Sequence, residues 1–325
     1  MASLREISER PDRLSPGHRL CAGCGASIVV RQVLLACEEP VVVANATGCL
    51  EVATTLYPYT AWRVPWIHSA FENTAATISG VEAMYRVLRR KGRLPHNGPV
   101  KFLAFAGDGG TYDIGLQALS GALERGHSFL YVCYNNEAYM NTGIQRSSAT
   151  PLGAHTTTAP AGRASPGKLQ PRKDLTAIVA AHRIPYAAQA SVHLWHDLMG
   201  KVRRALAAEG PTFLNVLAPC PRGWRHATSE TIDIARLAVE CGVWPIYEVA
   251  EGRLRITHRP RTRRPVTEWL ASQGRFAHLL EPGHEALIEQ IEREVEAEWE
   301  RLQRLERLGA ETGGSNGPDR GGTAH

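Results

Sequence analysis

The sequence predicts an α/β protein with an open, mainly parallel β-sheet and helices on both faces of that sheet. Two short apolar runs, residues 102–106 and 129–134, flank a helical pattern at residues 114–123 that is closed by Gly126. A strand, a helix and a strand in this order form a βαβ unit, whose strands lie parallel with a right-handed crossover. The polar clusters that follow both strands are therefore expected at the carboxyl edge of the sheet.

The remaining elements follow from the same two patterns. Helical spacing of apolar residues predicts helices over residues 26–37, a segment ending at 90, and residues 174–182, 194–208, 229–240 and 284–308. Short apolar runs predict strands over residues 41–44, 186–190 and 212–217. Loop-forming residues dominate two other long stretches, residues 50–80 and 151–171.

The chain divides into four segments. A polar arm (residues 1–20) precedes a core (residues 21–225), which is expected to hold the functional site. The extension that follows (residues 226–308) has seven arginines between positions 253 and 275, expected to form a solvated or subunit-contacting arm. It also has a helix with one apolar side, so we expect a subunit contact here. The Gly-rich tail (residues 309–325) is expected to be disordered.

Composition argues against several classes of protein. The 325 residues carry a net charge of +5 at pH 7, which is modest and spread along the chain, so nucleic-acid binding is not indicated. No apolar stretch approaches the ~20 residues that span a membrane, and the charged N-terminus lacks the apolar core of a secretion signal. We therefore expect a cytoplasmic protein. Its seven cysteines are then expected to be reduced thiols or metal ligands rather than disulfides.

Polar residues follow both strands of the central βαβ unit. The tetrapeptide GDGG (residues 107–110) comes after the first strand, and Asn136 follows the second. Adjacent strands lie ~4.8 Å apart, so Asp108 and Asn136 can share one ion. A carboxylate and an amide oxygen suit Mg²⁺, whose coordination is usually completed by phosphate oxygens and water. The glycines allow a diphosphate to approach the backbone, and the following helix presents its N-terminus to it. The sequence therefore predicts a Mg²⁺–diphosphate site.

Four cysteines form a second candidate site. Cys21 and Cys24 form a CxxC turn, while Cys49 and Cys220 each follow a predicted strand in a Gly- or Pro-rich turn. Four thiolates can hold either a [4Fe–4S] cluster or a structural zinc ion, and ligand type alone leaves both possible. Buried cysteine usually behaves as a small hydrophobe. On that ground three cysteines are left out of the site: Cys37, Cys133 and Cys241.

These motifs resemble a known family. The triplet GDG at residues 107–109, 25 intervening residues and then the pair of asparagines at 135–136 resemble the thiamine diphosphate (TPP) motif. The continuation EAYMNTG and the loops CAGCG, TGCLEV and CPRGW narrow the resemblance. The chain resembles the β subunit of the 2-oxoacid:ferredoxin oxidoreductases, most closely the pyruvate branch, over residues 17–280. This resemblance implies a TPP-binding pyrophosphate-type domain with an open parallel sheet.

The resemblance also implies roles for individual residues. Mg²⁺ would be held by Asp108, the side chain of Asn136 and the carbonyl of Ala138. Asn141 resembles the family residue that hydrogen-bonds near the reacting carbon, although an Asn before Thr-Gly is also typical of a turn. The [4Fe–4S] cluster nearest to TPP would be held by Cys21, Cys24, Cys49 and Cys220. Further contacts to TPP are implied at Gly48, Glu51, Gly107, Gly109, Gly110, Thr111 and Tyr139.

The implied function is the CoA-dependent oxidative decarboxylation of pyruvate to acetyl-CoA and CO₂, with electrons passed to ferredoxin. TPP enzymes need a carboxylate against the aminopyrimidine ring, and this chain is too short to hold the domain that supplies it. In the family it comes from the α subunit. The chain is therefore expected to be active only with α and γ/δ-type partner subunits, and its arginine-rich stretch could guide an acidic ferredoxin.

Two other functions remain open at this stage. The first is a TPP-dependent, non-redox decarboxylase-type subunit in which the four cysteines bind structural zinc. The second is a regulatory subunit that binds a nucleotide diphosphate. Within the leading interpretation, branched-chain 2-oxoacids and 2-oxoglutarate are alternatives to pyruvate, because the same cofactors act on all of them.

Overall fold

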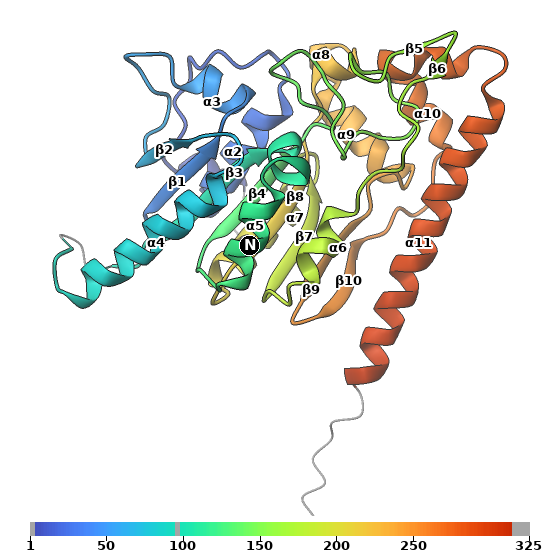
Figure 1. The fold of residues 1–325 in the computed structure, drawn as a ribbon. Helices are drawn as coiled ribbons and strands as arrows, with labels where there is room; N and C mark the ends of the chain where they lie inside the picture. Colours follow the sequence, from blue (N-terminus) through green and yellow to red (C-terminus); the bar gives the residue numbers. More distant parts are fainter. Residues whose placement is uncertain (1–3, 95–97, 314–325) are drawn as a thin grey trace, which may run out of the picture.

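An eight-stranded mixed sheet forms the centre of the computed structural model, which describes residues 4–94 and 98–313 (Figure 1). The strand order is β10-β9-β7-β8-β4-β3-β1-β2. The parallel strands are β7 (Tyr186–Ser191), β8 (Thr212–Leu217), β4 (Leu130–Asn135), β3 (Lys101–Gly107), β1 (Val41–Ala46) and β2 (Trp66–Ser69). Two antiparallel pairings add β9 (Ile246–Ala250) and β10 (Arg253–His258) beyond β7. The predicted mainly parallel sheet is confirmed.

Helices cover both faces of the sheet, as predicted. Those on one face are α2 (Gly25–Ala36) and α7 (Trp195–Ala207), and those on the other are α4 (Thr74–Arg90), α5 (Leu116–Glu124) and α6 (Leu175–Ala180). In β1, Val41 and Val43 face the first group, whereas Ala44 and Ala46 face the second. Strands buried on both sides need such continuous apolar runs, which is why the sequence predicts them well.

The central βαβ unit places its two polar turns side by side. β3 pairs with β4 in parallel, and Gly107 at the end of β3 lies opposite Tyr134 of β4. After β3 the chain forms a π-helical turn, η1 (Gly109–Asp113), that leads into α5. Asp108 and Asn136 therefore both lie at the carboxyl edge of the sheet.

Two stretches expected to be loop differ from each other. Residues 50–80 contain α3 (Cys49–Thr54) at their start, and later β2, which pairs with β1. β2 is an edge strand in which Ile67 and His68 are exposed, so it lacks the apolar run that marks the inner strands. Residues 151–171 do form a long loop, with one two-residue ladder between β5 (Ala161–Gly162) and β6 (Ser165–Pro166).

The extension after residue 225 contributes to the central sheet. Its elements, with the short helix before them, are α8 (Pro221–Trp224), η2 (Thr228–Glu230), α9 (Thr231–Glu240), β9, β10, α10 (Val266–Ala271), η3 (Gly274–Leu280) and α11 (Glu285–Gly313). The start of the expected arginine-rich arm is in fact β10, because Leu254 and Ile256 alternate with arginines and pack toward α11. Figure 1 shows α11 running beside β10 at that edge of the sheet.

The apolar side of α11 packs on the chain's own sheet. Trp299 and Leu302 contact Tyr247 and Ile256, and the Trp299 indole N–H donates to the Gly242 carbonyl over 2.9 Å. α11 continues to residue 313, so the first five residues of the predicted disordered tail are helical. The rest of that predicted tail, residues 314–325, lies outside the described residues.

The N-terminal arm packs against the core. It begins with α1 (Leu4–Ser8), and Leu14 is fully buried and bridges to Trp62. The first three residues of the arm lie outside the described part of the chain. No helix in the described ranges combines the length and the apolar composition that crossing a bilayer requires.

Candidate functional site: two adjoining cavities at the carboxyl edge

A small cavity of about 80 Å³ lies at the carboxyl ends of β1, β3 and β4. Its walls include most of the residues predicted to contact the diphosphate cofactor: Gly48, Gly107, Gly109, Gly110, Asn136, Ala138, Tyr139 and Asn141. They come from the turns after three different strands, so the parallel sheet is what brings them together. Phe71 also lines this cavity, as expected for the segment of residues 68–73. Tyr134 lines it too and was not predicted, because an aromatic side chain near a strand end carries no signal of its own.

Glycine is required at the turn after β3. A Cβ atom at Gly109 would lie 2.5 Å from the Tyr139 ring, and one at Gly110 would lie 3.2 Å from the Phe71 ring. Side chains at these positions would therefore collide with the rings that wall the cavity. The same lack of side chains leaves the backbone open to a diphosphate.

Asp108 lies beneath this cavity and is fully buried. The Ser147 hydroxyl donates to Asp108 Oδ2 over 2.5 Å, and the Asn136 backbone N–H donates to Oδ1 over 3.1 Å. Burial raises the pKa of Asp108 to about 7, although both hydrogen bonds act in the opposite direction. Within the described residues no lysine or arginine forms an ion pair with this carboxylate, so it is suited to a cation.

The amide of Asn136 completes a group of three polar atoms. One terminal atom of the amide lies 2.9 Å from Asp108 Oδ1 and 2.9 Å from the Ala138 carbonyl oxygen. Without a metal, the amide nitrogen faces these two oxygens and donates to both; a half-turn of the amide presents its oxygen instead. Adjacent ligands of an octahedral Mg²⁺ ion, at 2.0–2.1 Å from the metal, are also about 2.9 Å apart. The three predicted ligands therefore fit Mg²⁺.

The four predicted cluster cysteines line a second cavity, of about 260 Å³. Cys21 and Cys24 come from the loop before α2, Cys49 from the start of α3, and Cys220 from the turn after β8. The four thiols therefore come from three different segments of the chain. The other three cysteines are buried elsewhere in the core, as predicted: Cys37, Cys133 and Cys241.

Close packing fixes the loop that carries Cys21 and Cys24. Gly23 adopts φ +72°, and a Cβ atom there would overlap the Thr228 carbonyl oxygen. The Thr231 hydroxyl donates to the Gly23 carbonyl over 2.6 Å, and the Gly25 N–H donates to the Pro219 carbonyl over 3.1 Å. The loop is thereby held against the turn that carries Cys220.

The electrostatics of the thiols favour ligation over free thiolates. Burial, together with the charges of the neighbouring thiolates, raises the pKa of Cys24 to about 11 and that of Cys49 to about 12. A positively charged metal centre would replace these protons. In the residues that the structure describes, no three His, Cys, Asp or Glu side chains are grouped closely enough to hold one metal ion. The thiols thus share a cavity without forming a tight group.

The two cavities adjoin. Cys49, Asn136 and Asn141 line both of them, so the predicted diphosphate site and the four thiols share walls at one edge of the sheet. Asn141 is exposed and lies at this junction. The sequence predicted the common edge from the direction of the strands.

Two predicted contact residues face elsewhere. The Thr111 hydroxyl donates to the Gly107 carbonyl over 2.7 Å and is fully buried, so it stabilises the turn rather than lining the cavity. Glu51 accepts a hydrogen bond from Thr55 and lies 3.9 Å from His68, outside both cavity walls. Ser147, by contrast, was missed, because it lies in a stretch without periodic pattern.

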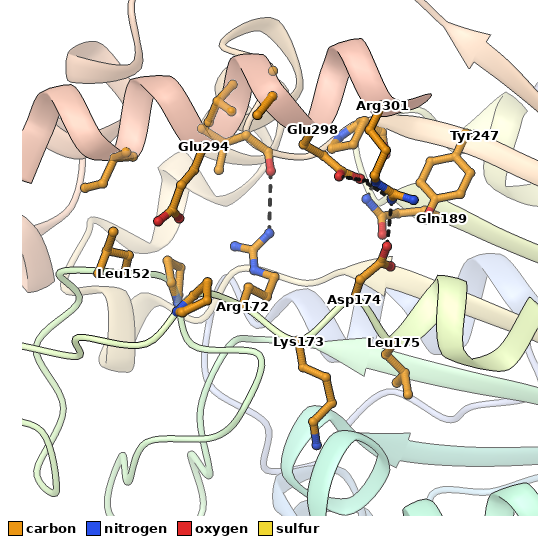
Figure 2. A pocket seen from close by; sticks show the side chains of 18 of the residues that line it. Leu152, Arg172, Lys173, Asp174, Leu175, Gln189, Tyr247, Glu294, Glu298 and Arg301 are labelled. Carbon is orange, nitrogen blue, oxygen red and sulfur yellow. Dashed lines mark hydrogen bonds and ion pairs between the residues drawn. The ribbon is translucent and has the colours of Figure 1, made fainter. Parts of the chain in front are cut away.

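A larger cavity, of about 450 Å³, lies between α11 and residues 171–175, and none of the predicted cofactor residues lines it (Figure 2). Three of its charged side chains pair with one another: Arg301 bridges Asp174 and Glu298 at 2.7 Å each. Arg172, which also lines this cavity, forms an ion pair with Glu137, which does not line it and follows Asn136 in the chain. The larger cavity is therefore not the predicted cofactor site.

Comparison with known proteins identifies relatives over most of the chain. The family model of the thiamine pyrophosphate enzyme C-terminal TPP-binding domain matches residues 46–216. The chain is 52% identical over 309 residues to the pyruvate synthase subunit PorB of Thermotoga maritima, spanning 94% of this chain and 95% of that one. It is 44% identical over 291 residues to the ketoisovalerate oxidoreductase subunit VorB of Pyrococcus abyssi, spanning 89% and 92%.

A solved structure shares the fold. The 2-oxoglutarate:ferredoxin oxidoreductase from Magnetococcus marinus superposes with a TM-score of 0.52 at 16% identity, over 70% of this chain and 81% of that chain. At this identity the likeness concerns the fold alone.

Proposed function

Because the chain belongs to the family of pyruvate synthase PorB subunits, we propose that it is the TPP- and [4Fe–4S]-binding β subunit of a pyruvate:ferredoxin oxidoreductase. The reaction is the CoA-dependent oxidative decarboxylation of pyruvate to acetyl-CoA and CO₂, with electrons passed to ferredoxin. The observation that carries the proposal is the pair of adjoining cavities, one suited to Mg²⁺–diphosphate and one lined by four thiols.

When bound, TPP supplies the nucleophilic carbon that adds to the 2-oxoacid, and a [4Fe–4S] cluster supplies an acceptor for single electrons. The chain's own residues bind and orient these groups. Asp108, Asn136 and Ala138 hold Mg²⁺, and the open turn of Gly109 and Gly110 holds the diphosphate. Asn141, at the junction of the cavities, is placed to hydrogen-bond near the reacting carbon. The four cysteines hold the cluster in the adjoining cavity, so the electron path from TPP to the cluster is short.

Partner subunits complete the site. The diphosphate cavity is small and open, and no residue of this chain is assigned to the aminopyrimidine ring. Beside the cysteine cavity, residues 52–59, at the end of α3 and in the loop after it, expose apolar side chains, with Tyr57 98% and Tyr59 79% exposed. Contiguous exposed apolar residues are typical of an interface. We therefore assign the missing carboxylate to an α-type partner subunit, and the chain is active only in that complex.

Pyruvate is the proposed substrate, because the relative with 52% identity is a pyruvate synthase subunit. The VorB relative acts, by its name, on ketoisovalerate at only slightly lower identity, so a branched-chain 2-oxoacid is the competing substrate. A cytoplasmic location is part of the same proposal, since reduced thiols are the form that binds metal.

The test uses the complex co-purified with its partner subunits under anaerobic conditions. We expect iron and acid-labile sulfide at four atoms each for this subunit's site, with broad visible absorption. We expect CoA-dependent viologen reduction that is fastest with pyruvate when pyruvate, ketoisovalerate and 2-oxoglutarate are compared. A colourless complex that contains zinc would favour the non-redox alternative. Calorimetry that shows tighter binding of ADP than of TPP with Mg²⁺ would favour a nucleotide-binding subunit.

A further inference from the structure

A buried ion network includes the loop of residues 136–138, which carries two of the three proposed Mg²⁺ ligands and is called the Mg²⁺ loop below. Glu137, between the proposed ligands Asn136 and Ala138, has φ +66° and a side chain with no exposed surface. Arg275 donates from Nη2 to Glu137 Oε2 over 2.5 Å, and Arg172 donates to Glu137 Oε1. A carboxylate in this environment is stable only while both guanidinium groups remain paired with it.

This network controls the backbone that carries the Mg²⁺ ligands. A left-handed conformation at a residue with a Cβ is unfavourable and persists only where surrounding contacts hold it. The Thr150 hydroxyl donates to the Glu137 carbonyl over 2.6 Å, and the Trp224 indole N–H donates to the Asn136 carbonyl over 2.7 Å. The two arginines fix the side chain of the same residue. The direction of the Ala138 carbonyl therefore depends on the Glu137–Arg275 contact.

Arg275 also lies close to the cysteine cavity. Its guanidinium stacks on Trp224 at 3.9 Å from the ring centre, and Trp224 belongs to α8, which begins immediately after Cys220. The positive charge of Arg275 and the negative charge of the Cys220 thiolate stabilise each other. Burial lowers the pKa of Arg275 to about 10, although the charges of Glu137 and Cys220 act in the opposite direction. One buried cation thus lies within electrostatic reach of both proposed cofactor sites.

We propose that Arg275 is a positioning residue for both cofactors: it holds the Mg²⁺ loop through Glu137, and its charge stabilises the reduced form of the cluster bound by Cys220. The inference rests on the proposed function. Net charge near an iron–sulfur cluster is one of the factors that set its potential. A positive charge raises the potential, because reduction adds negative charge to the cluster.

Four variants of the anaerobically purified complex test this role. Arg275→Met removes the charge, Arg275→Lys keeps it without the planar fork, and Glu137→Gln leaves Arg275 with an uncompensated charge. The double variant E137M/R275M removes both charges and so leaves the net charge unchanged. Arg264→Met is the matched control, because Arg264 lies in the same arginine-rich stretch but pairs with Glu240 and Glu268 at the surface.

Two quantities are measured: the Mg²⁺ affinity in the presence of TPP, by calorimetry, and the midpoint potential of the cluster, by EPR-monitored titration. We expect the Mg²⁺ affinity to fall about 10- to 100-fold in all four test variants, since residues that orient metal ligands typically have effects of this size. We expect the potential to fall in R275M, to rise in E137Q, and to stay near the wild-type value in R275K and in the double variant. R264M should match the wild type in both.

Opposite shifts in R275M and E137Q distinguish a charge effect from general loosening of the fold, which would move both potentials in one direction. Shifts of the same sign, or a shift in R275K as large as in R275M, would overturn the charge role. Unchanged Mg²⁺ affinity in E137Q and R275M would overturn the positioning role. Zinc in place of iron in the wild-type complex would overturn the proposed function and with it the charge role, while the Mg²⁺ affinities would still decide the positioning role.

Discussion

Asp108 is the residue on which the proposed Mg²⁺ site depends. It is fully buried, and no lysine or arginine in the described ranges pairs with it, so a divalent cation is its natural counter-charge. We expect Asp108→Asn to weaken Mg²⁺-dependent TPP binding by at least about 100-fold, more than the typical effect of a residue that only orients a ligand. Calorimetry on the complex measures this, with iron content as the readout for an intact cluster site.

The exposed Asp233→Asn serves as the matched control, because Asp233 pairs only with Arg236 on the surface of α9. Its TPP affinity should equal that of the wild type. TPP binding that survives unchanged in Asp108→Asn would place the Mg²⁺ site elsewhere.

The raised pKa of Asp108 gives the site a pH dependence. Burial moves this pKa from 3.8 to about 7, so without metal the folded chain holds the proton below pH 7 and Mg²⁺ must displace it. The Mg²⁺ affinity should therefore fall about tenfold for each pH unit below 7. For this group alone, the stability of the metal-free fold decreases as pH rises from about 4 through 7, and the stabilisation by Mg²⁺ and TPP should be larger at pH 8 than at pH 6.

Thermal melting with and without Mg²⁺ and TPP at pH 6 and pH 8 measures this difference. Ser147→Ala is a second variant for this test: the Ser147 hydroxyl lowers the pKa of Asp108, so its removal should raise that pKa. In that variant the loss of affinity should begin at higher pH. Equal melting shifts at both pH values would contradict the assignment.

Cys49 tests the second cavity, because it lines both cavities at their junction. We expect Cys49→Ala to lose most of the iron while the circular dichroism spectrum stays native, since the thiol contributes no disulfide and little packing. Cys241→Ala is the control: Cys241 is buried among Trp244, Trp269 and their neighbours and does not line the cavity of the four thiols. Full iron content in Cys49→Ala, or equal loss in Cys241→Ala, would count against Cys49 as a ligand.

At the scale of elements, inner and edge strands differ in how well the sequence predicts them. The inner parallel strands β1, β3, β4, β7 and β8 are buried on both faces, so their apolar runs mark them clearly. The inner antiparallel strand β9 is only partly buried at its last two residues and was not predicted. β2 and β10 lie at the two edges and carry exposed or charged residues. They have no continuous apolar run, so the sequence predicts a loop at β2 and a solvated or subunit-contacting arm at β10. Edge strands lack the signal because only part of their surface must be apolar.

Helix α11 stabilises the β9–β10 edge of the sheet. Trp299 is 3% exposed and packs on this hairpin. We expect Trp299→Ala to lower the free energy of unfolding by about 3–5 kcal/mol, the usual range for a buried tryptophan. Leu305→Ala, at a side chain of the same helix that is 38% exposed, should lower it by less than about 1 kcal/mol. Urea titration compares them. Similar losses in both would mean that α11 does not cover the sheet as described.

At the scale of the whole molecule, sequence predicted which turns meet but not what holds them in place. The direction of parallel strands is enough to bring residues 48, 108 and 136 to one edge. The contacts that fix these turns come from distant segments: Arg275 from the C-terminal extension, Thr228 from η2 and Ser147 from a loop. Such pairings depend on tertiary packing, which leaves no periodic pattern in the chain.

The wall shared by the two cavities makes their occupants thermodynamically interdependent. Cys49, Asn136 and Asn141 contribute to both, so whichever group binds first orders part of the lining that the other needs. If a cluster bound to the thiols raises the affinity for TPP, linkage requires that TPP raise the affinity for the cluster by the same factor. A preparation stripped of its thiamine should for this reason lose its colour sooner in air, and supplying the vitamin cofactor during purification should protect the metal.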